Sequence, residues 1–197
     1  MVTGKKPMSS VVVAERRWTY SDLVALPEDC LRHELLDGEH LVTPSPGTAH
    51  QMISKRLFLA LNEHVERLGL GEVLYAPFDI KLSLFTVLVP DLLYFTADRF
   101  ARVVNDRHAT AAPDLVIEVL SHGTRRRDKG RKRAVYEREG VGEYWIVDPE
   151  AEQVVILRRH ERDLRFTTVG RCGCGGRDAI ESPLFPGLRI PLARVFR

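Results

Sequence analysis

The segment PDLVIEVLS, residues 113–121, has the composition of an apolar β-strand but carries one acidic residue, Glu118, near its end. Burying an ionised carboxylate without a partner costs several kcal/mol, so this side chain needs a partner in any fold that buries the strand. The partner has to be a metal ion, a Lys or Arg side chain, or water at a cleft. Which of these it is decides what the protein does.

The N-terminal half predicts two helices and a hairpin. A short helix is expected over residues 19–26, before a proline ends it. The pair Asp37-Gly38 lies between two extended runs and predicts a β-hairpin. Residues 48–68 have the apolar spacing of an amphipathic helix, which Gly69 should close.

The remainder predicts strands and one polar helix, so that the whole is an α/β fold, a mixed sheet flanked by helices. The C-terminal residues 181–196 are apolar but rich in proline, which favours an irregular or short edge segment packed on the core. The extended runs are 71–83, 86–95, 113–121, 143–149, 152–159 and 164–170, and the polar helix is 126–139.

The length and composition suit a single domain. The chain has 197 residues, of which 44% are hydrophobic, and no long linker divides it. We expect this domain to span residues 16–197, after a mobile tail at residues 1–15. A formal net charge of +2 neither requires nor excludes a nucleic-acid partner.

Cysteine usage and hydropathy bear on the compartment. Three cysteines are too few for a disulfide framework and lack the spacing of a zinc site, which indicates a reducing cytoplasm. The N-terminal apolar run VVVA is too short for a signal peptide, and no later segment is long enough to span a bilayer. We therefore expect a cytoplasmic protein that does not enter the membrane.

Two Pro-Asp pairs could supply a second carboxylate beside Glu118. Asp114 lies four residues away on the same strand, so the two Cα atoms would be roughly 13 Å apart, too far to share an ion. Asp91 belongs to the preceding extended run, and a neighbouring strand only about 4.8 Å away can place it beside Glu118. Carboxylates that close repel each other unless a cation lies between them, and Mg²⁺ or Mn²⁺ with oxygen ligands meets that need.

A lysine could supply the positive charge instead. Asp128, Lys132 and Tyr136 recur at four-residue steps on the polar helix and form one stripe that can face the sheet. Lys129, one turn earlier, is a weaker alternative. A purely structural buried ion pair between Glu118 and Lys132, or an arginine, explains the geometry as well as a metal site does.

The motifs together resemble the Uma-type restriction endonuclease family of the PD-(D/E)xK nuclease superfamily. The similarity rests on VPD, on PDLVIEVLS, on the stripe at 128, 132 and 136, and on GVGEYWIVDPE. Supporting pieces occur in the same order, namely ALPED, HELLDGE, PSP followed by His50, and SPLFPGL. The resemblance extends from about Trp18 to Phe196 and implies a restriction-endonuclease-like fold that hydrolyses phosphodiester bonds with Mg²⁺.

The resemblance also implies roles for particular residues. Asp91, Glu118 and the carbonyl of Val119 would bind the metal ion. The superfamily usually has a lysine where this chain has a leucine, at position 120, so Lys132 would take its place from the following helix. Glu34 matches an acidic residue that contacts a second metal ion or orients water, although a surface carboxylate on the hairpin is the alternative.

The loop after the proposed metal strand departs from the family pattern. It reads SHGT at 121–124, where the family usually has Ser-Pro-Ser-Thr. His122 could therefore touch substrate, although a solvated loop histidine is the more common case. Asp128 and Tyr136 remain accessory candidates beside Lys132.

The segment 125–133 holds seven cationic side chains in nine residues, enough to neutralise several phosphates if it borders the cleft. A solvated helix face is the alternative. Tyr144 and Trp145 are expected to be core aromatics rather than platforms for base stacking. The residues expected to contact nucleic acid are Arg125, Arg126, Arg127, Lys129, Arg131 and Arg133.

These expectations define a metal-dependent endonuclease acting on DNA, with its site at an open edge of the sheet and a homodimer as one option for its assembly. Two alternatives remain. One is a nuclease-fold module that binds DNA with little turnover, and the other is a phosphohydrolase acting on a small nucleotide. Metal-dependent cleavage and salt-dependent binding of DNA distinguish the three.

Overall fold

The computed structural model describes residues 16–29, 31–160, 162, 164–173 and 176–197. The expected tail at residues 1–15 and two of the three cysteines, Cys30 and Cys174, lie outside the described residues. The third, Cys172, is buried with a free thiol. No helix of the described chain is long and apolar enough to cross a membrane.

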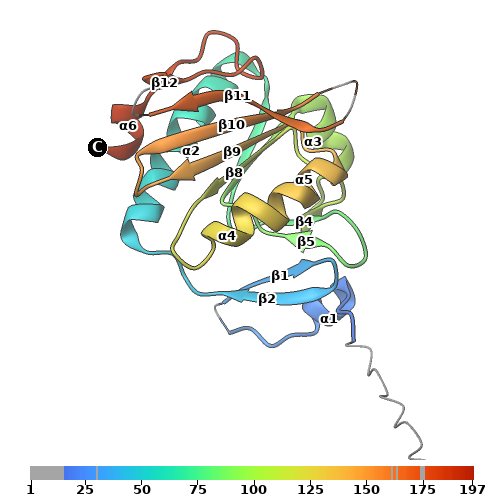
Figure 1. The fold of residues 1–197 in the computed structure, drawn as a ribbon. Helices are drawn as coiled ribbons and strands as arrows, with labels where there is room; N and C mark the ends of the chain where they lie inside the picture. The colour runs from blue at the N-terminus through green and yellow to red at the C-terminus, as the bar shows by residue number, and fades with distance from the viewer. Residues whose placement is uncertain (1–15, 30, 161, 163, 174–175) are drawn as a thin grey trace, which may run out of the picture.

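A six-stranded mixed sheet forms the centre of the molecule (Figure 1). Its strand order is β11-β10-β9-β8-β6-β3, in which β8 and β9 are parallel and the other neighbours antiparallel. The strands are β3 (Gly71–Tyr75), β6 (Leu92–Thr96), β8 (Leu115–Val119), β9 (Glu143–Asp148), β10 (Gln153–Arg159) and β11 (Phe166–Cys172).

A smaller five-stranded sheet lies beside it in the order β2-β1-β5-β4-β7. Its hairpin turns at Asp37 and Gly38, which both have positive φ, 56° and 90°, as a tight two-residue turn requires. The hairpin predicted at this pair is therefore confirmed. The strands are β1 (Arg32–Leu36), β2 (Glu39–Thr43), β4 (Asp79–Lys81), β5 (Val87–Leu88) and β7 (His108–Ala109).

Two long helical segments cover opposite faces of the six-stranded sheet (Figure 1). Helix α2 (Thr48–Leu68) packs one face through an apolar stripe and ends at Gly69 in the left-handed conformation, as predicted. The other face is covered by a continuous segment made of α4 (Arg125–Arg127), a π-helical stretch η1 (Asp128–Lys132) and α5 (Arg133–Glu139).

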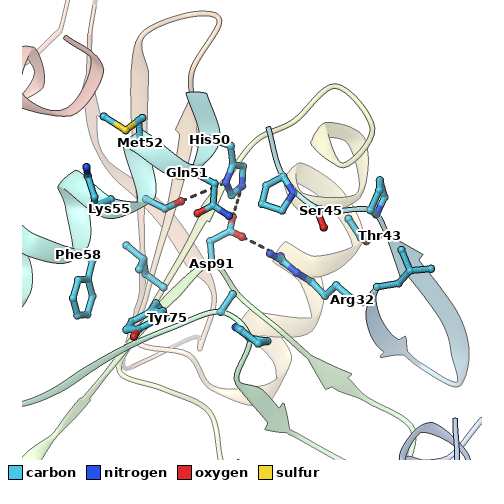
Figure 2. Close-up of a pocket in the computed structure, with 17 residues that line it drawn as sticks. Arg32, Thr43, Ser45, His50, Gln51, Met52, Lys55, Phe58, Tyr75 and Asp91 are labelled. Carbon is cyan, nitrogen blue, oxygen red and sulfur yellow. Dashed lines mark hydrogen bonds and ion pairs between the residues drawn. The ribbon is translucent and has the colours of Figure 1, made fainter. Parts of the chain in front are cut away.

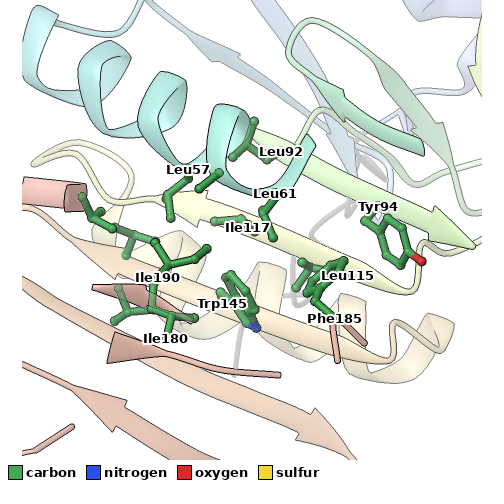
Figure 3. Close-up of a cluster of buried hydrophobic side chains, with 14 of the residues drawn as sticks. Leu57, Leu61, Leu92, Tyr94, Leu115, Ile117, Trp145, Ile180, Phe185 and Ile190 are labelled. Carbon is green, nitrogen blue, oxygen red and sulfur yellow. The ribbon is translucent and has the colours of Figure 1, made fainter. Parts of the chain in front are cut away.

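The core beneath α2 joins the helix to the sheet and to the C-terminal segment (Figure 3). Leu57 and Leu61 of the helix meet Ile117 of β8, and Trp145 and Phe185 pack edge to face at 6.3 Å. Trp145, like Tyr144 next to it, is buried, which confirms that both are core aromatics. This packing fixes β8, the strand that carries Glu118.

The short elements differ most from the sequence expectation. The run 86–95 is broken at Pro90 into β5 and β6, because proline has no amide to donate to a ladder. Residues 181–189 of the C-terminal segment are irregular and pack on the core as expected, but the segment then forms the short strand β13, which pairs with β12, and a short helix. The remaining elements are α1 (Tyr20–Val24), α3 (Ala97–Val103), β12 (Ala179–Ile180), β13 (Ile190–Pro191) and α6 (Leu192–Phe196).

Candidate active site

The two predicted metal-binding carboxylates lie at the same end of adjacent strands. Leu92 of β6 pairs with Ile117 of β8, and the next step along this antiparallel ladder brings Asp91 opposite Glu118. Both strands are internal, since β3 flanks β6 and β9 flanks β8. The expectation of a site at an open sheet edge is therefore wrong, and the residues instead lie where two internal strands meet a loop.

Glu118 is enclosed by the helical segment on its face of the sheet. Its side chain is 3% exposed, and Oε1 accepts hydrogen bonds from Lys132 Nζ at 2.8 Å and from the Tyr136 hydroxyl at 2.7 Å. Burial raises the pKa of Glu118 to about 8, while Lys132 opposes the shift and the carboxylate of Asp128 adds to it. The carboxylate is thus held in surroundings that favour its neutralisation.

Lys132 lies between two buried carboxylates. Its Nζ is 2.8 Å from an oxygen of Glu118, 2.8 Å from an oxygen of Glu34 and 4.0 Å from Asp128. Desolvation lowers the pKa of Lys132, but the surrounding carboxylates outweigh it and the net shift is upward, so the amine remains an ammonium. Lys129, the weaker alternative, binds Asp148 at 3.2 Å and does not reach Glu118.

Glu34 belongs to this cluster and not to the surface. It is fully buried, and its Oε1 also accepts the backbone N–H of Val89 at 2.9 Å. The alternative of a surface hairpin carboxylate is wrong, because the side chain of Glu34 has no exposed surface and lies against Lys132 of the helical segment. One oxygen of Glu34 and one of Asp128 are buried without a hydrogen-bond partner among the described residues.

Asp91 is held by two side chains that the sequence did not identify as site residues. Its Oδ1 is 3.0 Å from Arg32, and its Oδ2 is 3.0 Å from His50 Nε2 and 2.8 Å from the N–H of Val119 (Figure 2). Burial alone would raise the pKa of Asp91, but the hydrogen bond and charge of His50 and the charge of Arg32 lower it overall. Asp91 is therefore a carboxylate in the folded protein.

A cavity of about 340 Å³ opens between these groups. Asp91, Glu118, Asp128 and Lys132 line it on the side of the sheet and the helical segment. The loop after β8 closes another side, where His122 is exposed and faces the same space. The loop 43–47 before α2 completes the wall. The predicted residues Asp91, Glu118, Val119, His122, Asp128 and Lys132 thus share one cavity, whereas Tyr136 lies behind Glu118.

The carboxylate oxygens that line this cavity are ligands of the type that a hard cation such as Mg²⁺ binds, but several of them already have partners in the protein. Carboxylate oxygens are the ligands that Mg²⁺ prefers, and the buried Oδ1 of Asp128 accepts no hydrogen bond from the described residues, although Arg127 and Lys132 lie 3.9 and 4.0 Å from it. Among the described residues, no three His, Cys, Asp or Glu side chains are arranged as a metal cage. An ion bound here would have two side chains, a carbonyl and water as its ligands, and Asp91 would have to release Arg32 or His50 to bind it.

The basic segment is largely paired within the protein. Arg125 and Lys129 bind Asp148, and Arg131 binds Glu39 at 2.7 Å. Arg127 is 3.8 Å from Glu34 and, of the predicted phosphate-binding side chains, it is the one that lines the cavity. The remaining two, Arg126 and Arg133, contact no carboxylate of the described chain.

Comparison with solved structures identifies a similar fold. A protein from Anabaena variabilis ATCC 29413, described as a "putative nuclease belonging to DUF820", superposes with a TM-score of 0.73 and 18% sequence identity. The match covers 91% of this chain and 97% of that chain. The predicted α/β fold with mixed sheets flanked by helices is therefore confirmed. No curated protein matches the sequence significantly.

The sequence itself matches one family. The model of the family Uma2, described as "Putative restriction endonuclease", covers residues 20–193. The matched segment contains every residue of the cluster around Glu118. The resemblance that the motifs indicated is thus confirmed, and the chain belongs to the Uma2 family.

Proposed function

We propose that this protein is a divalent-metal-dependent endonuclease that hydrolyses DNA phosphodiester bonds. Family membership supports a nuclease function in general. The observation that carries this proposal is that three buried carboxylates, Asp91, Glu118 and Asp128, line one cavity together with Lys132. Buried ionisable groups with a shifted pKa, such as Glu118 and Lys132, are typical of a catalytic centre when they line a cleft. A fourth buried carboxylate, Glu34, does not line the cavity but lies 2.8 Å from Lys132 Nζ.

Charge argues against a purely structural ion pair. Lys132 lies within 4.0 Å of the carboxylates of Glu34, Glu118 and Asp128, and Arg127 lies within 4.0 Å of two of these, so two cationic side chains face three acidic groups. A buried pair kept for stability would be satisfied within the core, yet here Glu118, Lys132 and Asp128 all line a cavity. Burial raises the pKa of the third acidic group, Glu118, to about 8, so a further cation would favour its ionised form.

The residues divide into direct and supporting roles. Asp91, Glu118 and the carbonyl of Val119 would hold Mg²⁺ or Mn²⁺. When bound, that ion supplies Lewis acidity toward the scissile phosphate and lowers the pKa of water. Lys132 Nζ can turn from Glu118 toward a phosphate oxygen and offset the charge that develops on it. The hydroxyl of Tyr136 meanwhile keeps Glu118 oriented.

Three supporting residues position the direct ones. Arg32 and His50 fix the two oxygens of Asp91 and can exchange this contact for one with a DNA phosphate. Glu34 Oε1 also lies 2.8 Å from Lys132 Nζ and would keep the ammonium at the site when it leaves Glu118.

The proposal is tested by incubating the full chain with plasmid, linear duplex and single-stranded DNA in Mg²⁺, in Mn²⁺ and in EDTA. We expect cleavage with either metal and none with EDTA. Binding of DNA without cleavage would favour the nuclease-fold binding module. Hydrolysis of nucleoside triphosphates with no action on DNA would favour the small-nucleotide phosphohydrolase.

The two unpaired arginines give a prediction for DNA affinity. Arg126→Glu combined with Arg133→Glu should weaken binding of all sequences and flatten the plot of log K against log salt by about two units, because each phosphate contact contributes about 0.9. Fluorescence anisotropy over a salt series measures this slope. Arg102→Glu combined with Arg194→Glu makes the same change of charge at exposed positions elsewhere and should leave the slope nearer to wild type. Equal slopes for the two double variants would remove the phosphate role of this segment.

A further inference from the structure

A second and larger cavity adjoins the proposed catalytic one. It has a volume of about 660 Å³, within the range of about 300–1,000 Å³ that is typical of small-molecule sites. Asp91, Arg32 and His50 line both cavities, so a ligand in one lies next to a ligand in the other. Figure 2 shows these three side chains in the larger cavity. The residues shared by both cavities are Arg32, Thr43, Pro44, Ser45, Pro46, His50 and Asp91.

Much of the lining of this cavity is apolar and aromatic. Tyr75, the last residue of β3, is 61% exposed, and its ring packs edge to face against Phe58 of α2 at 4.9 Å and 73°. Leu31 and Met52, also exposed, line the same cavity. Exposed apolar side chains gathered in a concavity, with polar groups at the rim, mark a surface that binds something.

The polar groups at this cavity indicate a negatively charged occupant. Arg32, His50 and Lys55 all line it, and Asp91 is the acidic residue among the lining residues. Lys55 is exposed on α2 and makes no ion pair with any described residue. A ligand with a flat apolar face and an anionic group would satisfy both parts of the cavity at once.

We propose that this cavity binds an unstacked nucleobase of the DNA strand whose phosphate occupies the neighbouring catalytic site. The inference rests on the proposed function and narrows its substrate. The base stacks on Tyr75, and Lys55 contacts an adjacent phosphate. Every base has a face that can stack on an aromatic ring, so the site tolerates any sequence.

The proposal has a consequence for the form of DNA that is recognised. A base within an intact duplex is stacked on both sides and cannot enter a pocket without an unstacking cost of a few kcal/mol. Single strands, frayed ends and bulges present the base without most of that cost. The enzyme should therefore prefer DNA with an unpaired nucleotide beside the scissile phosphate.

A double-mutant cycle without metal tests the contact directly. The probe is a short fluorescein-labelled single-stranded oligonucleotide, compared with the same backbone made of abasic residues, and anisotropy in EDTA gives the affinities. Wild type should bind the intact strand about tenfold or more tightly than the abasic one, the effect of stacking one base on an aromatic ring. Tyr75→Ala should remove most of this difference, whereas Tyr75→Phe, which keeps the ring, should retain it.

The controls separate stacking from loss of exposed apolar surface. Leu59→Ala removes an exposed side chain from α2 outside the cavity and should leave the preference for the intact strand unchanged. Lys55→Ala should weaken binding of both strands equally, since a phosphate contact does not depend on the base. The unfolding temperature of each variant confirms that the fold is kept.

The outcomes distinguish this pocket from the proposed reaction. If wild type cleaves DNA with Mg²⁺ but Tyr75→Ala keeps the full preference for intact strands, the base pocket is wrong and the nuclease assignment stands. If no DNA is cleaved but the coupling between Tyr75 and the base is present, the pocket stands and the proposed reaction fails. A dimer that dissociates in Tyr75→Ala, with no coupling to the base, would show that a second copy covers this surface instead.

Discussion

Asp91→Asn and Glu118→Gln should each lower metal-dependent DNA cleavage by more than about 10²-fold, the loss that follows removal of a single charge-stabilising group. Both changes replace a carboxyl group, which can ionise and bind a cation, with a neutral amide of the same shape. The amide oxygen introduced by Asp91→Asn can still accept the N–H of Val119, and that introduced by Glu118→Gln can still accept the hydroxyl of Tyr136, so the fold should survive. Single-turnover cleavage in Mg²⁺ measures the rates, and thermal unfolding checks the fold.

The chain offers a matched control for each substitution. Asp114 also follows a proline and binds an arginine, Arg99, at 2.6 Å, but it lies at the other end of β8. Glu143 is a buried strand carboxylate like Glu118, with 2% exposure, and it binds Arg158 away from the cavity. Asp114→Asn and Glu143→Gln should lower stability without removing cleavage.

The results separate the two readings of the carboxylate cluster. Cleavage at the wild-type rate by either site variant would overturn the metal assignment. Loss of folding in both site variants, with the two control variants folded, would favour a structural ion pair. Mn²⁺ binding measured by calorimetry gives a readout that does not depend on turnover, and each site variant should weaken it.

The parts of the fold that can be predicted from the sequence are those that depend on residues close together in the chain. The turn at Asp37-Gly38 needs two residues with positive φ, and few residue pairs other than this type allow it. Helix α2 was visible because its apolar spacing extends over 21 residues. The stripe of Asp128, Lys132 and Tyr136 can likewise be predicted from regular helical spacing, here of four residues. The segment Asp128–Lys132 is nevertheless π-helical rather than α-helical.

The parts that were missed depend on contacts between distant segments. Arg32 and His50 meet Asp91 across 59 and 41 residues of chain, and no periodicity reports such pairings. His50 belongs to one of the family motifs, but the motif does not indicate that its side chain contacts Asp91. Glu34 is buried because the helical segment covers the face of the hairpin on which its side chain lies. A five-residue strand with mixed polarity does not determine this.

The ion pairs of the basic segment 125–133 also depend on residues distant in the chain and could not be predicted from the sequence. Its charge density is plain in the sequence, but five of its seven cationic side chains have carboxylate partners in the structure. Those partners, such as Asp148 and Glu39, lie far away in the chain. Local clustering therefore overstates the charge that is free to meet a phosphate. Arg126 and Arg133 remain, and an affinity for DNA based on them alone should be modest.

Lys132→Ala should lower cleavage by about 10²-fold or more, the usual cost of losing a donor to the transition state, while DNA binding changes little. The same change leaves Glu34 and Glu118 buried without their shared cation, which costs about 3–5 kcal/mol of stability. Adding Glu34→Gln removes one of these charges and keeps an acceptor for the N–H of Val89. The double variant should therefore recover part of the lost stability and allow the catalytic loss to be measured in a folded protein.

Position 120 allows a test of gain as well as loss. Leu120 is 3% exposed and follows Glu118 by two residues on the same face, the place where the superfamily pattern would put a lysine. Leu120→Lys in the Lys132→Ala background should return part of the rate, because the new ammonium can approach Glu118 from the strand itself. Lys129→Ala removes a half-exposed lysine bound to Asp148 and should have a much milder effect. Single-turnover cleavage by these variants tests the role of Lys132. Full activity in Lys132→Ala would overturn this role. A failed rescue in a protein with lowered stability would instead reflect the cost of burying a charge among the apolar neighbours of Leu120.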